Sequence, residues 1–132
     1  MREVLFRGKV SDNGNWIEGS LIVGRDLESG EFIYIVSPLS AYYTEAKKVI
    51  PESVSEFTGL TDKNGKKIFE GDVVRFSYNE NDKDPKFYSI EWKSDRACFG
   101  YGETADKMLE VDALHCEVIG KIHDNPELLK GK

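Results

Sequence analysis

Apolar and polar residues alternate in short stretches along most of the chain, and turn-forming residues separate these stretches. Alternation with a period of two residues is typical of strands that bury one face. Short strands joined by frequent Gly, Asn and Asp turns favour a sheet protein, so the pattern predicts a mostly β fold with minor α. The predicted strands are residues 4–10, 15–23, 31–37, 73–78, 86–93, 97–102 and 115–123.

The first two predicted strands are expected to form a β-hairpin. Residues 11–14 read Ser-Asp-Asn-Gly, and Asn-Gly accepts the positive φ that tight hairpin turns require. Gly19 lies inside the second strand, where a glycine indicates a bulge or a close backbone approach. Residues 24–30 are predicted to be a polar loop.

Helical structure is expected only in short pieces. Residues 51–57 predict a single helical turn that begins at Pro51, and residues 125–129 predict a short closing helix with Asn125 as its N-cap. Two stretches stay undecided: residues 39–48 fit a helix or an irregular crossing, and residues 104–114 fit a strand or a helix.

Residues 57–74 contain the highest density of turn-forming residues in the chain. Asp62 to Gly65 form a second hairpin-type turn, and residues 70–72 form a further turn that starts the next strand. We interpret these turns as an architectural joint between an N-terminal β unit, residues 1–57, and a small, strongly bent barrel, residues 58–132, the two forming one compact unit. The structural turn residues are Gly59, Asp62, Asn64, Gly65, Gly71 and Asp72.

The 132-residue chain has a net charge of −6. Residues 1–56 hold 6 basic and 9 acidic side chains, and the remainder holds 12 and 15, so neither half is basic. A protein that tracks phosphates needs a positive face, so this balance argues against a nucleic-acid binder and leaves it as an alternative.

The predicted location is the cytoplasm. The charged start of the chain does not resemble a signal peptide, and no apolar run approaches the ~18 residues of a membrane span. Cys98 and Cys116, without a secretory signal, are expected to be reduced thiols.

Metal and catalytic chemistry are weakly supported. Asp62, Glu70 and Asp72 offer carboxylates for Mg²⁺ or Ca²⁺, but the lysines after Gly65 would repel a cation, so turn-shaping roles are preferred. In a regular strand, His115 and His123 would lie ~26 Å apart, too far to share a zinc ion. Because no nucleophile elbow, phosphate loop or zinc motif appears, we expect no catalytic residues, no cofactor and no metal.

Four aromatic side chains are expected to be half exposed and to form a candidate interaction surface. Small β-barrels use such faces to bind bases or peptides, although most aromatic residues in a small core serve packing. The four are Trp16, Tyr34, Tyr78 and Tyr101.

Three ordered motifs resemble the YopX family of phage and prophage proteins. They are the opening hairpin around residues 1–16, the central segment around residues 50–74, and the closing segment around residues 117–129. The resemblance implies an SH3-like C-terminal barrel and a phage or prophage origin. It brings no known activity, so no catalytic or ligand residue is transferred. Lys121 to Asp124 depart from the more neutral, Asn/Tyr-rich sequence expected there.

The sequence therefore predicts a non-enzymatic accessory protein that binds another macromolecule, most readily a protein. A nucleic-acid-binding protein and an enzyme of unrecognised type are the alternatives. Self-association is a further option, because exposed strands at a sheet edge can pair.

Overall fold

The computed structural model describes residues 3–28, 30–38, 44–77, 81, 83–103, 107–108 and 110–130. The fold is mostly β, as the alternation predicts. The chain divides into two compact units, residues 1–57 and residues 58–132, which are described separately.

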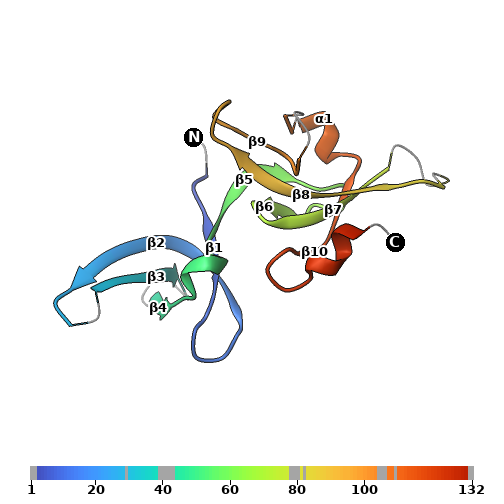
Figure 1. Cartoon of the computed structure of the whole chain (residues 1–132). Helices are drawn as coiled ribbons and strands as arrows, with labels where there is room; N and C mark the ends of the chain where they lie inside the picture. The colour runs from blue at the N-terminus through green and yellow to red at the C-terminus, as the bar shows by residue number, and fades with distance from the viewer. Residues whose placement is uncertain are drawn as a thin grey trace. The chain divides into compact units, whose positions relative to one another are not determined.

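Unit 1 is an antiparallel sheet with the strand order β4-β3-β2-β1-β5 (Figure 1). An isolated antiparallel bridge joins the two sides of this sheet. It connects Val49, just after β4, with Val10, just after β1. Val10, Val49 and Ile35 are buried and form the core of this unit. The elements are β1 (Phe6–Lys9), β2 (Trp16–Asp26), β3 (Gly30–Pro38), β4 (Thr44–Lys48), the 3₁₀ turn η1 (Pro51–Ser53) and β5 (Ser55–Thr61), whose second half belongs to unit 2.

The hairpin predicted at the start of the chain is confirmed. Phe6 to Lys9 pair antiparallel with Gly19 to Trp16. The loop closes where the Val10 N–H donates to the Asn15 carbonyl at 2.7 Å, and Gly14 adopts a φ of 73°.

Of the two alternatives predicted at Gly19, a bulge or a close backbone approach, the structure shows the close approach. Strand β2 pairs with β1 up to Gly19 and with β3 from Ser20 onward. A Cβ on Gly19 would lie 2.1 Å from the carbonyl oxygen of Val36. The absence of a side chain at Gly19 therefore allows β3 to approach β2 closely where β2 changes its pairing partner.

The polar loop expected over residues 24–30 is shorter than predicted. Strand β2 continues to Asp26 and β3 begins at Gly30, because Gly24 pairs with Phe32 on the neighbouring strand. The Phe32 ring lies where a Cβ on Gly24 would be, so the ring covers the glycine. Of the undecided residues 39–48, residues 44–48 form β4, and residues 39–43 lie outside the described part.

Unit 2 contains an antiparallel sheet with the order β10-β7-β8-β9, and strand β6 pairs with β5. This arrangement is compatible with the small barrel that the resemblance implies. Of the undecided residues 104–114, residues 110–113 form a helical turn, and residues 104–106 and 109 lie outside the described part. The elements are β6 (Lys67–Phe69), β7 (Asp72–Phe76), β8 (Lys86–Lys93), β9 (Cys98–Tyr101), α1 (Glu110–Ala113), β10 (Cys116–Lys121) and the 3₁₀ helix η2 (Pro126–Lys130).

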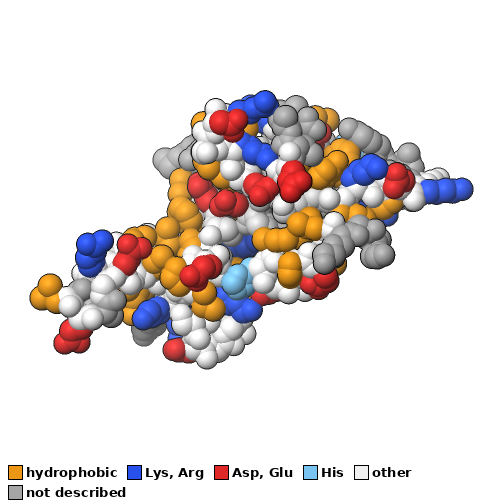
Figure 2. All heavy atoms as spheres, in the orientation of Figure 1, with side chains coloured by type: hydrophobic (Ala, Val, Ile, Leu, Met, Phe, Trp, Pro, Cys, Tyr) orange, Lys and Arg blue, Asp and Glu red, His pale blue; other side chains and the backbone are white. Residues whose placement is uncertain are grey.

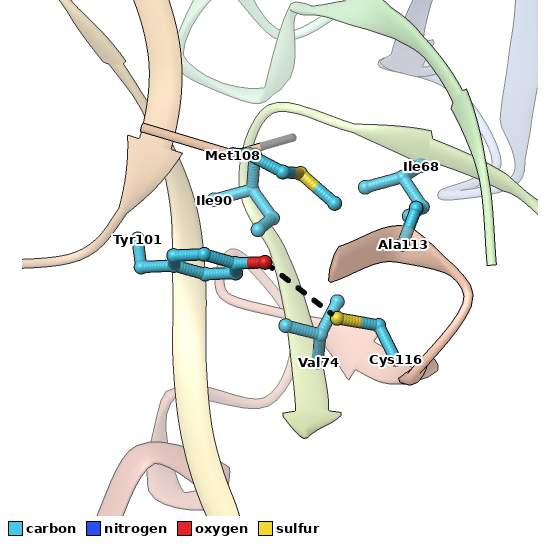
Figure 3. Packing of buried hydrophobic residues seen from close by; sticks show 7 residues of the cluster. All are labelled: Ile68, Val74, Ile90, Tyr101, Met108, Ala113 and Cys116. Carbon is cyan, nitrogen blue, oxygen red and sulfur yellow. Dashed lines mark hydrogen bonds between the residues drawn. The ribbon is translucent and has the colours of Figure 1, made fainter. Parts of the chain in front are cut away.

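The core of unit 2 lies between its strands and α1 (Figure 3). Its members are distant in sequence and all almost fully buried. They are Ile68, Val74, Ile90, Tyr101, Met108, Ala113 and Cys116.

Candidate interaction surface

The Asp62 carboxylate is buried, with 4% of its residue surface exposed. One oxygen, Oδ1, accepts hydrogen bonds from the N–H groups of Asn64 and Lys66, both at 2.9 Å. The other, Oδ2, accepts one from the Val118 N–H, also at 2.9 Å. The carboxylate thus shapes the β5–β6 turn and joins it to β10, and its oxygens are directed to backbone donors.

Asp72 serves a second turn in the same way. Its Oδ2 accepts a hydrogen bond from the Phe69 N–H at 2.8 Å, which spans the turn between β6 and β7. Gly71 adopts a φ of 84° there. Its N–H donates to the Ile90 carbonyl and its carbonyl accepts from the Ile122 N–H, both at 2.7 Å. The turn is therefore fixed to β8 and to the segment after β10.

Across the described part of the chain, no three His, Cys, Asp or Glu side chains gather into a group that could hold a metal ion. His115 lies against the Phe76 ring, with 6.3 Å between ring centroids. His123 is exposed, and Asp62 and Asp72 are buried in separate turns.

The expectation that Tyr101 is half exposed is wrong. Only 5% of the residue is exposed, because the Phe76 and Tyr88 rings pack on it at centroid distances of 6.1 and 5.1 Å. Its hydroxyl points at the Cys116 sulfur, 4.0 Å away (Figure 3). Tyr101 belongs to the core, and Tyr78 lies outside the described residues.

The environment of this pair suppresses ionisation. Burial, with smaller contributions from Cys116 and Asp112, raises the pKa of Tyr101 far above its usual range. Burial also raises the pKa of the Cys116 thiol to about 11. A thiol that stays protonated near neutral pH is a poor nucleophile, so the pair is suited to packing.

The remaining two aromatic candidates, Trp16 and Tyr34, lie on the same face of the unit 1 sheet. Tyr34 pairs directly with Ile22, and Trp16 shares the face of Ile22 because side chains alternate along β2. The Arg7 guanidinium lies over the Trp16 ring, 5.3 Å from its centroid. Its Nε donates to the Ser55 hydroxyl at 3.1 Å, so Arg7 is held between the ring and β5.

Tyr34 lies in an apolar patch that sequence reasoning did not find as a group. Ile22 is its direct partner across β2 and β3, and 48% of Ile22 is exposed. The Phe32 ring meets Tyr34 edge to face, with 5.5 Å between centroids and 84° between planes. We call Ile22, Phe32, Tyr34 and Val36 the β2–β3 patch.

The patch and the core of unit 1 lie on opposite faces of β3. Ile35, which follows Tyr34, is fully buried, whereas the patch residues are half-buried or exposed. Figure 2 shows hydrophobic side chains at the surface of the β2–β3 ribbon, between charged ones. Trp16 is six residues before Ile22 on β2, which separates the two along the strand by ~20 Å. Alternation along each strand does not show that Ile22 and Tyr34 are neighbours, because their contact depends on the register between β2 and β3.

Among the helices that the structure describes, none is long and apolar enough to cross a membrane.

These features define a small β protein of two units with an exposed apolar patch on one sheet. The sequence model of the family described as YopX protein matches residues 5–130, and the chain belongs to this family. The chain is also similar to the crystal structure of protein EF1440 from Enterococcus faecalis, with 23% sequence identity and a TM-score of 0.62. The similarity covers 98% of this chain and 99% of that chain, and it shows a shared fold. No match is found among curated proteins.

Proposed function

We propose that the chain is a non-enzymatic accessory protein, encoded by a phage or prophage, that binds another protein in the cytoplasm of its bacterial host. The observation that supports this proposal is the β2–β3 patch. Aromatic and aliphatic side chains in contact at an exposed surface are typical of the centres of protein interfaces.

The construction of the patch favours a protein partner. Its residues stand on paired strands, and the Phe32 ring is already held between Gly24 and Tyr34. Side chains that are ordered before binding lose little conformational entropy when a partner covers them. A sheet face with four neighbouring apolar and aromatic side chains matches another apolar protein surface better than it matches a phosphate backbone.

Two neighbouring positions on β2 provide a matched test. Ile22 lies in the patch, and Val23 points to the opposite face of the strand, with exposed fractions of 48% and 56%. We expect Ile22→Asp to weaken partner binding at least ~10-fold, because a carboxylate would be desolvated at the interface. Val23→Asp adds the same charge to the same strand and is expected to leave binding within ~2-fold.

The measurement is affinity capture from host lysate with the wild-type chain and both variants, followed by titration of the recovered protein. Circular dichroism of each variant checks that the sheet is intact. Equal recovery by wild type and Ile22→Asp would contradict the patch as the binding surface. Failure of the wild-type chain to enrich any protein above an unrelated acidic control would contradict the proposed function.

A further inference from the structure

Unit 2 has an open groove of about 550 Å³ on the face of β8 that points away from its core. Alternation along β8 explains the position, because Ile90 enters the core and its neighbours Ser89 and Glu91 face the groove. This groove is separate from the β2–β3 patch, which belongs to unit 1.

The lining of the groove combines two kinds of side chain. Ile122 and Leu129, from the segment after β10 and from η2, are apolar. Glu91 and Glu103 are acidic, and both are exposed. Within the described residues neither carboxylate forms an ion pair. The groove therefore combines an apolar wall with two negative charges.

A hydroxyl group completes the groove. Ser89 lines the groove, although only 9% of the whole residue is exposed. Gly102, also in the lining, has no side chain, and a Cβ there would stand 3.6 Å from this Oγ and 3.7 Å from Glu91 Oε2. The Lys93 ammonium group donates to the Gly102 carbonyl oxygen, so this cation is engaged by the backbone. The Ser89 hydroxyl in the lining can accept a hydrogen bond from a bound cation.

We propose that this groove binds a basic side chain, lysine or arginine, from an extended segment of a partner protein. Its ammonium or guanidinium group would lie between Glu91 and Glu103 and donate to the Ser89 hydroxyl. Its methylene stem would lie along Ile122 and Leu129, since long basic side chains bury their stems on apolar surface. The chain's net charge of −6 favours approach of a basic segment.

Three alternative ligands fit less well. A bare divalent cation prefers six or more oxygen ligands, and the groove brings together two carboxylates and one hydroxyl. An acidic or phosphorylated segment would be repelled by both glutamates. A neutral apolar side chain would use one wall and leave the charges and Ser89 without partners.

The test uses the full-length chain labelled with ¹⁵N and short peptides of glycine with one central Arg, Lys, Leu or Glu. We expect the Arg and Lys peptides to shift the backbone amide signals of Ser89, Glu91 and Gly102, with a dissociation constant of ~1 mM, as suits a single exposed side chain. The shifts should decrease when the NaCl concentration rises from about 0.02 M to about 0.3 M, because salt screens exposed charges.

Two double variants separate the groove from general charge effects. Glu91→Gln with Glu103→Gln should weaken peptide binding at least ~10-fold. Glu52→Gln with Asp95→Asn removes the same two charges at exposed positions outside the groove and should change binding less than ~2-fold.

Three results would overturn the proposal. They are equal binding of the Leu or Glu peptide, unchanged binding by the groove variant, and stronger shifts of the same amides by CaCl₂ than by the basic peptides. The experiment needs no natural partner, so its outcome is independent of the Ile22→Asp test of the β2–β3 patch.

Discussion

At the scale of single residues, the Asp62 carboxylate stabilises its own turn and also the contact of that turn with β10. It accepts three backbone hydrogen bonds, two inside the turn and one from Val118 on β10. We expect Asp62→Ala to lower the free energy of unfolding by about 3 kcal/mol, because buried N–H donors would lose their partners. Urea unfolding monitored by tryptophan fluorescence measures this loss.

Exposed Asp95 provides the control for Asp62. It lies in the turn between β8 and β9, and Asp95→Ala is expected to change the free energy of unfolding by less than ~0.5 kcal/mol. If the two variants were equally stable, the bonds to the Asp62 carboxylate would contribute nothing.

The buried Cys116 thiol predicts a loss of stability in alkali. Burial raises its pKa from the ordinary 9.0 to about 11 in the folded chain. The unfolded chain therefore releases this proton first, and the stabilisation is complete below pH 9 and is lost as the pH rises towards 11. The expected decrease is roughly 2 to 3 kcal/mol, and the raised pKa of Tyr101 extends it to higher pH.

Urea unfolding at several pH values between 8 and 11 measures this slope. Cys116→Ala is the control, because it removes the thiol proton and keeps every other titrating group. Its stability should fall less steeply with pH than that of the wild-type chain. Parallel curves for the two proteins would show that the thiol does not contribute.

These residues also mark how far the sequence can predict the site. The turn chemistry of Asp62 to Gly65 is local, so the sequence identifies it. The bond from Asp62 to Val118 joins residues 56 positions apart, and only the tertiary fold creates it. For Tyr101, alternation indicates which side chains share a face but not that Phe76 and Tyr88 cover that face. The exposure of Tyr101 was therefore wrongly predicted.

At the scale of elements, β2 is the strand on which unit 1 depends. It is 11 residues long, pairs with β1 in its first part and with β3 in its second, and changes partner after Gly19. Sequence alternation identified β2 and β3 but ended β2 early, because Gly24 and the charged residues after it are typical of a loop. The register with β3, and the Phe32 ring over Gly24, extend the ribbon and create the patch.

Two glycines of β2 should respond differently to the same substitution. In Gly19→Ala the new methyl group would lie 2.1 Å from the backbone oxygen of Val36, so β3 itself must move. In Gly24→Ala it would lie 2.3 Å from the Phe32 ring, which can rotate away. We expect a loss of about 3 kcal/mol for Gly19→Ala and about 1 kcal/mol for Gly24→Ala.

Thermal and urea unfolding of the two variants test this order, and each variant serves as the control for the other. Ring rotation in Gly24→Ala would also alter the patch, so this variant should bind the partner captured in the lysate experiment more weakly. A larger loss of stability for Gly24→Ala than for Gly19→Ala would contradict the account of the close approach between Gly19 and Val36.

At the scale of the whole molecule, the distribution of charged residues favours protein binding over nucleic-acid binding. Residues 1–57 and 58–132 each carry a net charge of −3, with acidic and basic residues interspersed along the chain. Binding to a phosphate backbone needs several cations on one surface, and each contact releases counterions and strengthens as salt falls.

We expect no gel retardation of duplex DNA, single-stranded DNA or RNA even at about 0.05 M NaCl, where such contacts are strongest. A shifted band that weakens steadily with added salt would instead show a local basic surface and favour the nucleic-acid alternative. A shift that persists regardless of salt would indicate aggregation, and the elution volume of the free chain in size-exclusion chromatography would identify it.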